Sequence, residues 1–286
     1  MSPSSSLEKL ANYRSRNTRD SRDTFETAFM LYERQGLGRL GDEKWPFLEQ
    51  LALAAVDVGR TDVARECCEQ LAVQFPGSPR LHCLEGILEE TVSPGNALQF
   101  YQRLLTEDPT NAAAWKRLAS VFRRVGQTER AIKELQEYLD TFYTDIDGWL
   151  ELSDIYATNN RYDFALRSLS HALLLAPQNP FYVLLAAETA YTMDDVTLAL
   201  KYFLMVVDMM DSTGDKSVKD SEPNSITVRA WYGVQLSARR LREEPKLASQ
   251  SASETPLAKD IPLLEDLATE MLGKAYATEG AVSATQ

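Results

Sequence analysis

Apolar positions in this chain recur at an interval of 34 residues, in short stripes with helical spacing. Trp115, Leu118 and Phe122 lie at i, i+3 and i+7, which places them on one face of a helix. Gly126 follows this stripe and is suited to end a helix, because glycine tolerates positive φ. Ala131 then opens a second stripe. Each copy is therefore predicted to be two antiparallel helices joined by a tight turn.

The same positions recur in successive copies and form five columns. These columns are Leu81, Trp115, Trp149 and Val183; Leu84, Leu118, Leu152 and Ala186; Leu88, Phe122, Tyr156 and Ala190; Ala97, Ala131, Ala165 and Ala199; and Tyr101, Leu135, Leu169 and Phe203. A further copy lies upstream, displaced by one residue, with Leu48, Leu51, Ala52, Ala55, Ala64, Cys68, Leu71 and Pro76. One such helix pair cannot bury its apolar face alone, whereas several stacked pairs can. We therefore expect Trp149 to be largely buried between pairs, so that Trp149→Ala would cost about 3 to 5 kcal/mol.

This spacing and residue pattern resembles the tetratricopeptide repeat. The resemblance implies an all-α fold, an α-solenoid of antiparallel helix pairs. The predicted organisation is an N-terminal arm and capping helix in 1–44, five repeats in 45–213, and a degenerate helical hairpin with a flexible tail in 214–286. Within the outer parts, helices are expected near 21–35, 225–243 and 258–278, and polar loops at 211–225 and 248–256.

Charge and composition exclude several classes of function. The 30 basic and 42 acidic residues give a net charge of -12, so nucleic acid is a poor partner. Arg14, Arg16, Arg19 and Arg22 form a basic patch, which we interpret as a solvated helix face or arm rather than a lipid-binding site. We expect neither a membrane-spanning segment nor a secretory signal. The three cysteines are expected to be reduced, buried thiols.

No catalytic or metal-binding arrangement is predicted. Gly36–Gly41 matches G-x-G-x-x-G but follows a predicted helix, so a loop is favoured over a nucleotide site. Cys67 and Cys68 are adjacent and fit a core position, and His82 and His171 lack the spacing of zinc ligands. The acidic pairs Glu89–Glu90 and Asp194–Asp195 are interpreted as solvated surface. We therefore expect no enzyme activity, no cofactor and no small-molecule substrate.

A repeat solenoid offers a concave groove lined by the first helix of each pair. In this chain the predicted partner-binding residues are Lys116, Ser120, Arg123, Asp147, Leu150 and Asp154. Repeats that grip the acidic tails of chaperones carry a clamp of Lys and Asn at set positions. The matching positions hold Glu49 and Leu53, His82 and Gly86, and Lys116 and Ser120, so that clamp pattern is missing.

Several stretches resemble one family more closely: GDEKW at 41–45, GRTDVARECCEQL at 59–71, QFPGS at 74–78, EDPTNAAAWKR at 107–117, AIKELQEYL at 131–139 and LKYF at 200–203. They are similar to subunit 2 of the endoplasmic reticulum membrane protein complex. This resemblance implies a non-catalytic scaffold, peripheral to the cytosolic side of the endoplasmic reticulum membrane. Its partners would be the other integral membrane and cytosolic subunits, in a complex that inserts transmembrane helices, including tail anchors. The alternatives are a soluble adaptor or cochaperone that binds peptide tails, and an enzyme that uses the glycine motif.

Overall fold

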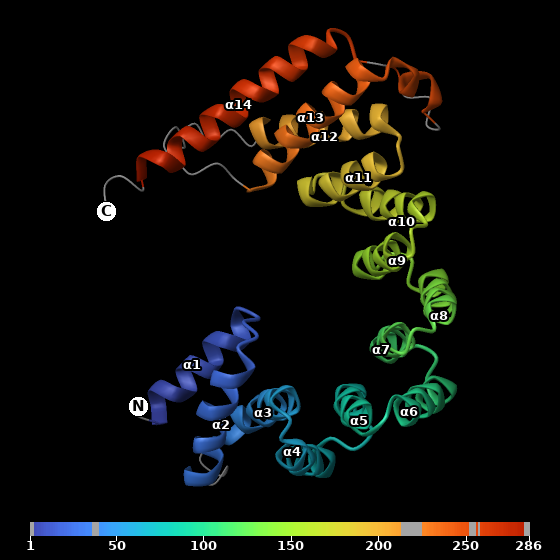
Figure 1. Ribbon diagram of the computed structural model, residues 1–286. Helices are drawn as coiled ribbons and strands as arrows, with labels where there is room; N and C mark the ends of the chain where they lie inside the picture. Colours follow the sequence, from blue (N-terminus) through green and yellow to red (C-terminus); the bar gives the residue numbers. More distant parts are fainter. Residues whose placement is uncertain (1–2, 36–39, 213–224, 252–255, 257, 283–286) are drawn as a thin grey trace. The chain divides into compact units, whose positions relative to one another are not determined.

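The computed structural model describes residues 3–35, 40–212, 225–251, 256 and 258–282. The chain divides into two compact units, Met1–Tyr138 and Leu139–Gln286, and each is described by itself. The described residues contain helices and no strand. The predicted all-α tetratricopeptide-repeat solenoid is therefore confirmed as the fold (Figure 1).

The first unit is a series of helices in which neighbours along the chain pack together. Helix α3 packs on both α2 and α4, and α5 packs on α6. The helices are α1 (Pro3–Ser15), α2 (Ser21–Gln35), α3 (Lys44–Val58), α4 (Thr61–Gln74), α5 (Pro79–Val92), α6 (Pro94–Glu107), α7 (Ala112–Arg124) and α8 (Thr128–Thr141), the last of which reaches three residues into the second unit.

Within the second unit, helices that are neighbours along the chain also pack together. Helix α9 packs on α10, α11 on α12, and α13 on α14. These helices are α9 (Ile146–Thr158), α10 (Tyr162–Leu175), α11 (Pro180–Thr192), α12 (Val196–Ser212), α13 (Ser225–Glu243) and α14 (Ile261–Val282), with a short 3-10 helix, η3 (Pro245–Gln250), between the last two. Helices α2, α13 and α14 lie close to the three ranges expected outside the central repeats.

Local signals set the ends of the helices. The Asn111 side chain accepts a hydrogen bond from the Ala114 amide at 3.1 Å and so caps α7. Gly59 and Gly126 take positive φ angles of 84° and 77°, just after α3 and α7. Because the helices end at these positions, the turns between paired helices are short.

Four of the five columns are buried throughout. The alanines Ala97, Ala131, Ala165 and Ala199 are each 0% exposed, which allows the two helices of a pair to approach closely. Tyr101, Leu135 and Leu169 are also 0% exposed and fill the space beside them. The small and large residues thus alternate across the contact, as the repeat pattern predicts.

The tryptophan column differs from the prediction, because Trp115 and Trp149 are only partly buried. Each indole N–H donates to a backbone carbonyl of the preceding turn, that of Pro109 at 3.0 Å and that of Tyr143 at 2.9 Å. The Trp149 ring also stacks on His171, with centroids 4.2 Å apart. A partly exposed ring buries less apolar surface than a fully buried one. Trp149→Ala should therefore lower the free energy of unfolding by less than about 3 to 5 kcal/mol.

The N-terminal arm contains a helix for which no range was predicted, since residues 3–15 form helix α1. This helix packs on α2, and Leu10 is fully buried between them. Lys9 adds an ion pair to Asp23 of α2. Only Leu7 and Leu10 mark the buried face in a serine-rich stretch, which is too weak a pattern to predict a helix.

The acidic pair Asp194–Asp195 is also not plain solvated surface. Asp195 is 4% exposed and caps α12 by accepting a hydrogen bond from the Leu198 amide at 3.2 Å. It also accepts one from the Ser251 hydroxyl at 2.7 Å, which ties the segment after η3 to the start of α12. Asp194 is exposed and pairs with Arg240 at 2.8 Å.

Cys67 and Cys68 are buried in the core of the first unit, as predicted. Burial raises the pKa of each thiol to about 12, so both are protonated at neutral pH. Iodoacetamide at pH 7.5 should therefore modify neither thiol in the folded chain, and both after unfolding in urea. Peptide mass spectrometry checks this result, and rapid labelling of Cys67 without denaturant would contradict the assigned burial.

Some predicted features lie outside the described residues: residues 36–39 of the glycine motif, 213–224 and 252–255 of the two polar loops, and 283–286 of the tail. Among the helices that are described, none is both long and apolar enough to cross a membrane.

Candidate interaction surface

A groove crosses α3 in the first unit, between the α1–α2 turn on one side and α5 and α7 on the other. Its volume is about 430 Å³. We call it the N-terminal groove. Its floor includes Pro46, Leu53 and Ala54 of α3, and its charged lining residues are Arg14, Arg19, Asp20, Glu49, Asp57, Arg80 and Arg117.

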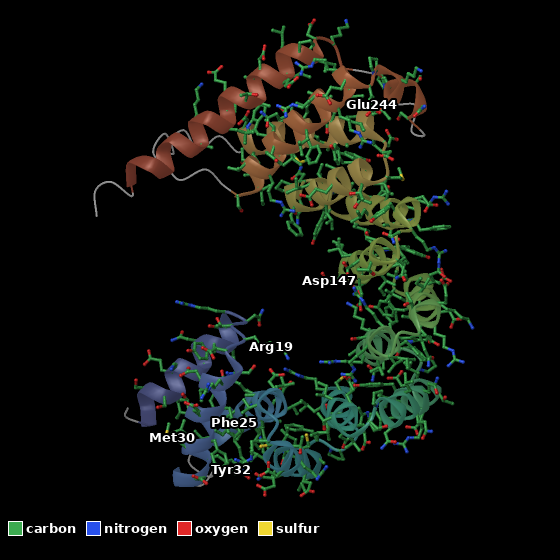
Figure 2. All side chains as sticks on the ribbon, in the orientation of Figure 1. Arg19, Phe25, Met30, Tyr32, Asp147 and Glu244 are labelled. Carbon is green, nitrogen blue, oxygen red and sulfur yellow. The ribbon has the colours of Figure 1, made fainter. Side chains whose placement is uncertain are left out.

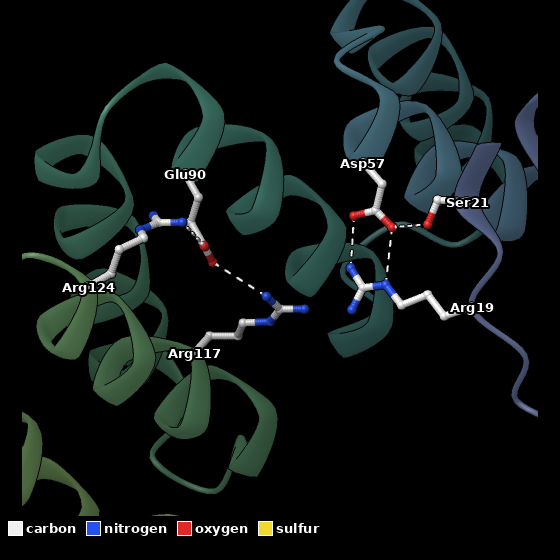
Figure 3. Close-up of polar contacts among 6 residues, drawn as sticks. All are labelled: Arg19, Ser21, Asp57, Glu90, Arg117 and Arg124. Carbon is white, nitrogen blue, oxygen red and sulfur yellow. Dashed lines mark hydrogen bonds and ion pairs between the residues drawn. The ribbon is translucent and has the colours of Figure 1, made fainter. Parts of the chain in front are cut away.

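One wall of the groove is held by an ion pair between the α1–α2 turn and α3. Arg19 donates from Nε and Nη2 to the two carboxylate oxygens of Asp57, at 3.1 and 2.8 Å. The Ser21 hydroxyl donates to the same carboxylate (Figure 3). A two-pronged contact of this kind fixes direction as well as distance. It therefore orients the turn that carries Arg19 over the end of α3.

Hydrogen bonds from Arg19 are the largest cause of a lowered pKa at Asp57, and the Ser21 hydroxyl and the nearby charge of Arg117 act in the same direction. A depressed pKa in the folded state stabilises the fold above the unfolded value, near 3.9, and this contribution is lost as the pH falls through the folded value. The pair is partly exposed, so we expect no more than about 0.5 kcal/mol from it.

Arg19→Ala should raise the titration midpoint of the Asp57 carboxyl toward its ordinary range, as measured by NMR between pH 2 and 6. Arg16→Ala, which changes an exposed neighbour, is the control and should leave the midpoint unchanged. An equal midpoint in the Arg19 variant would show that the pair does not form in solution.

Arg117, which lines the groove on the side of α7, belongs to a cluster around a carboxylate with three partners. Glu90 of α5 accepts a hydrogen bond from the Tyr101 hydroxyl at 2.9 Å, and it pairs with Arg124 at 3.2 Å and with Arg117 at 3.8 Å. Its side chain is only 10% exposed, so the interpretation of Glu89–Glu90 as solvated surface is wrong for Glu90 (Figure 3). This carboxylate joins α5 to α6 and α7, two successive helix pairs.

Gly86 explains how Tyr101 reaches Glu90. A Cβ atom at position 86 would lie 2.4 Å from the Tyr101 ring, closer than such atoms come in real structures. The absence of a side chain therefore lets the phenol pass directly over α5. Burial and the neighbouring Glu90 raise the pKa of Tyr101, so its hydroxyl remains a donor across the physiological range.

The predicted basic patch is largely engaged within the chain. Arg14 pairs with Glu43 at 2.8 Å and donates to Gln50 at 3.1 Å. Arg22 pairs with Glu26 on its own helix at 3.3 Å. The four arginines are divided among α1, the turn after it and α2, so they do not form one helix face, and Arg14 attaches α1 to Gln50 of α3.

The six predicted groove residues are not brought together in one described place. Lys116, Ser120 and Arg123 belong to the first unit, and Asp147, Leu150 and Asp154 to the second. None of them lines the N-terminal groove. The Lys116 ammonium lies 5.8 Å from the Tyr138 ring centroid, so it packs over α8. Whether the six residues bind a partner remains a prediction.

On α7 the sequence pattern predicts Lys116 as a groove residue, whereas its neighbour Arg117 lines the N-terminal groove. Arg117 and Arg124, next to the predicted Lys116 and Arg123, carry the cluster around Glu90. One signal was present, since Asp57, Glu90 and Arg124 occupy the same place in three successive copies, the first two acidic and the third basic. Of the clamp positions, Glu49 and Leu53 line the groove, while His82 lies elsewhere, beside Glu85 and Arg103.

The site is suited to holding another polypeptide more than to bond chemistry. Its charged groups include two arginine–carboxylate pairs, Arg19–Asp57 and Arg80–Glu49, beside neutral polar side chains, and the described parts of the chain hold no cluster of three His, Cys, Asp or Glu side chains that could take a metal. Paired guanidinium groups at a groove rim are typical of binding surfaces.

Comparison with known proteins supports the repeat fold. Residues 62–201 match the family model described as EMC2 TPR-like repeat domain. The chain is 32% identical over 277 residues to ER membrane protein complex subunit 2 of Xenopus tropicalis, covering 96% of this chain and 86% of that one. It is 28% identical over 218 residues to the subunit of the same name from Dictyostelium discoideum, covering 73% and 66% of the two chains.

Two further similarities fit the repeat fold. The TPR repeat protein oca3 of Schizosaccharomyces pombe is 38% identical over 145 residues, covering 50% of this chain and 51% of that one. The C-terminal part of a TPR repeat-containing protein from Cytophaga hutchinsonii has a solved structure with TM-score 0.54 and 18% identity, covering 90% and 98% of the two chains. The likeness to the Xenopus protein extends over nearly the whole chain, and this chain therefore belongs to the family of ER membrane protein complex subunit 2.

Proposed function

We propose that this chain is a non-catalytic scaffold subunit of an endoplasmic reticulum membrane protein complex. The observation that carries the proposal is the 32% identity to the Xenopus subunit across 96% of the chain. In this role the repeats hold other subunits, both integral membrane and cytosolic, in fixed positions. The chain contributes surface rather than reactive groups.

The physical design of the repeats supports such a role. Within each unit, neighbouring helices pack on one another, and stacked repeats of this kind present a large surface for their mass. The N-terminal groove shows how side chains from α3, α5 and α7 combine into one such surface. A larger surface of this kind suits simultaneous contact with several partners.

We further propose that the chain acts on the cytosolic face of the endoplasmic reticulum and supports insertion of transmembrane helices, including those of tail-anchored proteins. Protease added to intact microsomes should then digest a tag on the chain without detergent. Loss of the chain should reduce insertion of a tail-anchored reporter, measured by glycosylation of a site in its lumenal tail.

Controls distinguish a loss of tail-anchor insertion from a general loss of protein entry or glycosylation. A secreted reporter that needs no tail insertion should be glycosylated normally in the same cells. Normal insertion of the tail-anchored reporter without the chain would refute the insertion role. Protection of the tag until detergent is added would refute the cytosolic placement.

A further inference from the structure

A second cavity adjoins the N-terminal groove. This pocket has a volume of about 290 Å³ and apolar walls formed by Trp45, Leu71, Phe75, Leu81 and Leu84. We call it the Trp45 pocket. The Trp45 and Phe75 rings meet edge to face at its mouth, with centroids 5.3 Å apart. Phe75 is 42% exposed, so an apolar surface is open to solvent here.

The pocket and the groove share three lining residues, Pro46, Glu49 and Arg80. Arg80 of α5 donates to Glu49 of α3 at 3.0 Å from Nε, with a second contact of 2.9 Å from Nη2. This ion pair stands between the two cavities. An apolar pocket and a polar groove are therefore separated by one side-chain pair.

In three ion pairs along this surface, the arginine is the more exposed partner. In the Arg80–Glu49 pair the arginine side chain is 82% exposed and the glutamate 26%. In the Arg19–Asp57 pair the values are 80% and 26%. Arg117 is likewise more exposed than Glu90. In these three pairs the carboxylate lies beneath its arginine, whereas Asp20 at the α1–α2 turn is exposed and Arg14 is less exposed than its partner Glu43.

These arginines keep hydrogen-bond donors for a ligand. A guanidinium has five N–H donors, and Arg80 and Arg19 each make their contacts to a carboxylate through Nε and Nη2. The remaining N–H groups belong to exposed atoms at the rim of the groove. A carboxylate from another chain matches them in charge and in planar geometry.

We propose that the Trp45 pocket and the N-terminal groove together bind an acidic segment of a partner polypeptide, with one apolar side chain in the pocket and carboxylates on Arg80 and Arg117. This inference rests on the proposed scaffold function and specifies the chemistry of one of its partners. A basic segment does not fit, because it would meet exposed guanidinium groups. Nucleic acid is disfavoured because the chain as a whole carries a net charge of -12.

The test uses the purified full chain and a fluorescein-labelled nonapeptide that carries one phenylalanine followed by four glutamates. Fluorescence polarisation should show saturable binding that weakens as salt is raised from about 50 to 300 mM. Arg80→Gln combined with Arg117→Gln should weaken binding at least about tenfold, since two charge-assisted contacts are lost. A peptide with alanine in place of phenylalanine should also bind more weakly.

Two control variants make the result specific. Arg65→Glu removes an exposed arginine of α4 that does not line either cavity, and it should leave the affinity unchanged. Phe75→Ala opens the pocket and should reduce the difference between the phenylalanine and alanine peptides. Thermal unfolding of every variant, followed by circular dichroism, separates lost binding from lost structure.

Several outcomes would overturn the inference: no saturation with the acidic peptide, equal binding of a peptide with lysines in place of the glutamates, or unchanged affinity in the folded Arg80 and Arg117 variant. Purification from cells keeps this test apart from the scaffold proposal. If the wild-type chain retains membrane subunits but the peptide does not bind, the scaffold stands and this inference fails. If the peptide binds but no membrane subunit is retained, the scaffold proposal fails.

Discussion

Tyr101→Ala should lower the free energy of unfolding of the first unit by about 3 to 5 kcal/mol, the range for removing a large buried aromatic side chain. Tyr101 is 0% exposed and is among the largest fully buried side chains of the chain. Its loss leaves a cavity between α5 and α6 and removes the hydroxyl donor of Glu90. Since the free energy of unfolding of a folded domain is only about 5 to 15 kcal/mol, this change should remove a large fraction of it.

Hydrogen exchange read by mass spectrometry locates the effect as well as its size. Each helix pair is supported mainly by its neighbours, so protection should fall first in α5, α6 and α7 and least in α13 and α14. Tyr101→Phe is the matched control, which keeps the ring and should cost less, about 1.5 to 3 kcal/mol for the lost hydrogen bond to the Glu90 carboxylate. Uniform loss of protection through the whole chain would contradict a stack of neighbour-supported pairs.

Gly233→Ala should destabilise the second unit by about 1 to 3 kcal/mol, the cost of forcing an extra atom into a packed core. A Cβ atom there would lie 2.3 Å from the Phe203 ring, which is 4% exposed between α12 and α13. The ring cannot move away without disturbing the core that surrounds it. The clash outweighs the gain of up to about 1 kcal/mol that alanine normally brings to a helix.

Gly273→Ala on α14 provides the matched control. A Cβ atom at this exposed position meets nothing within 4 Å, so the helix preference of alanine should act alone and stabilise by up to about 1 kcal/mol. Urea unfolding followed by circular dichroism measures both variants. Opposite signs for the two glycines are expected, whereas stabilisation by Gly233→Ala would show that α12 and α13 pack less closely than described.

The fold could be predicted because its signals are periodic and local. Alanines such as Ala97 and Ala131 recur at a fixed interval, and a small residue opposite a large one at every repeat has few structural explanations. Burial of these columns follows from the same pattern. The partial exposure of Trp149 could not be predicted, because it depends on the carbonyl of Tyr143 and the ring of His171. Neither contact can be recognised from the spacing of apolar residues along the chain.

The candidate surface was harder to predict for a related reason. Helical spacing predicts which face of a helix is buried, but not the rotation of the helix to within one residue. The pattern therefore predicts Lys116, whereas Arg117 lines the groove. The contact of Arg19 with Asp57 joins residues 38 positions apart, one of them in a turn, and no repeat interval connects them. Pairs of this kind depend on how α2 packs on α3, and the sequence pattern does not specify that packing.

The most direct test of the scaffold account is affinity purification of the tagged full chain from its own cells in mild detergent, with mass spectrometry of the co-eluting chains. The account predicts a particle far larger than the 32.1 kDa of this chain, containing integral membrane proteins in fixed ratio to it. Buffer without detergent should leave this material in the membrane pellet. Recovery of the chain as a stable monomer, or only with chaperones and no membrane protein, would contradict the account and favour a soluble adaptor.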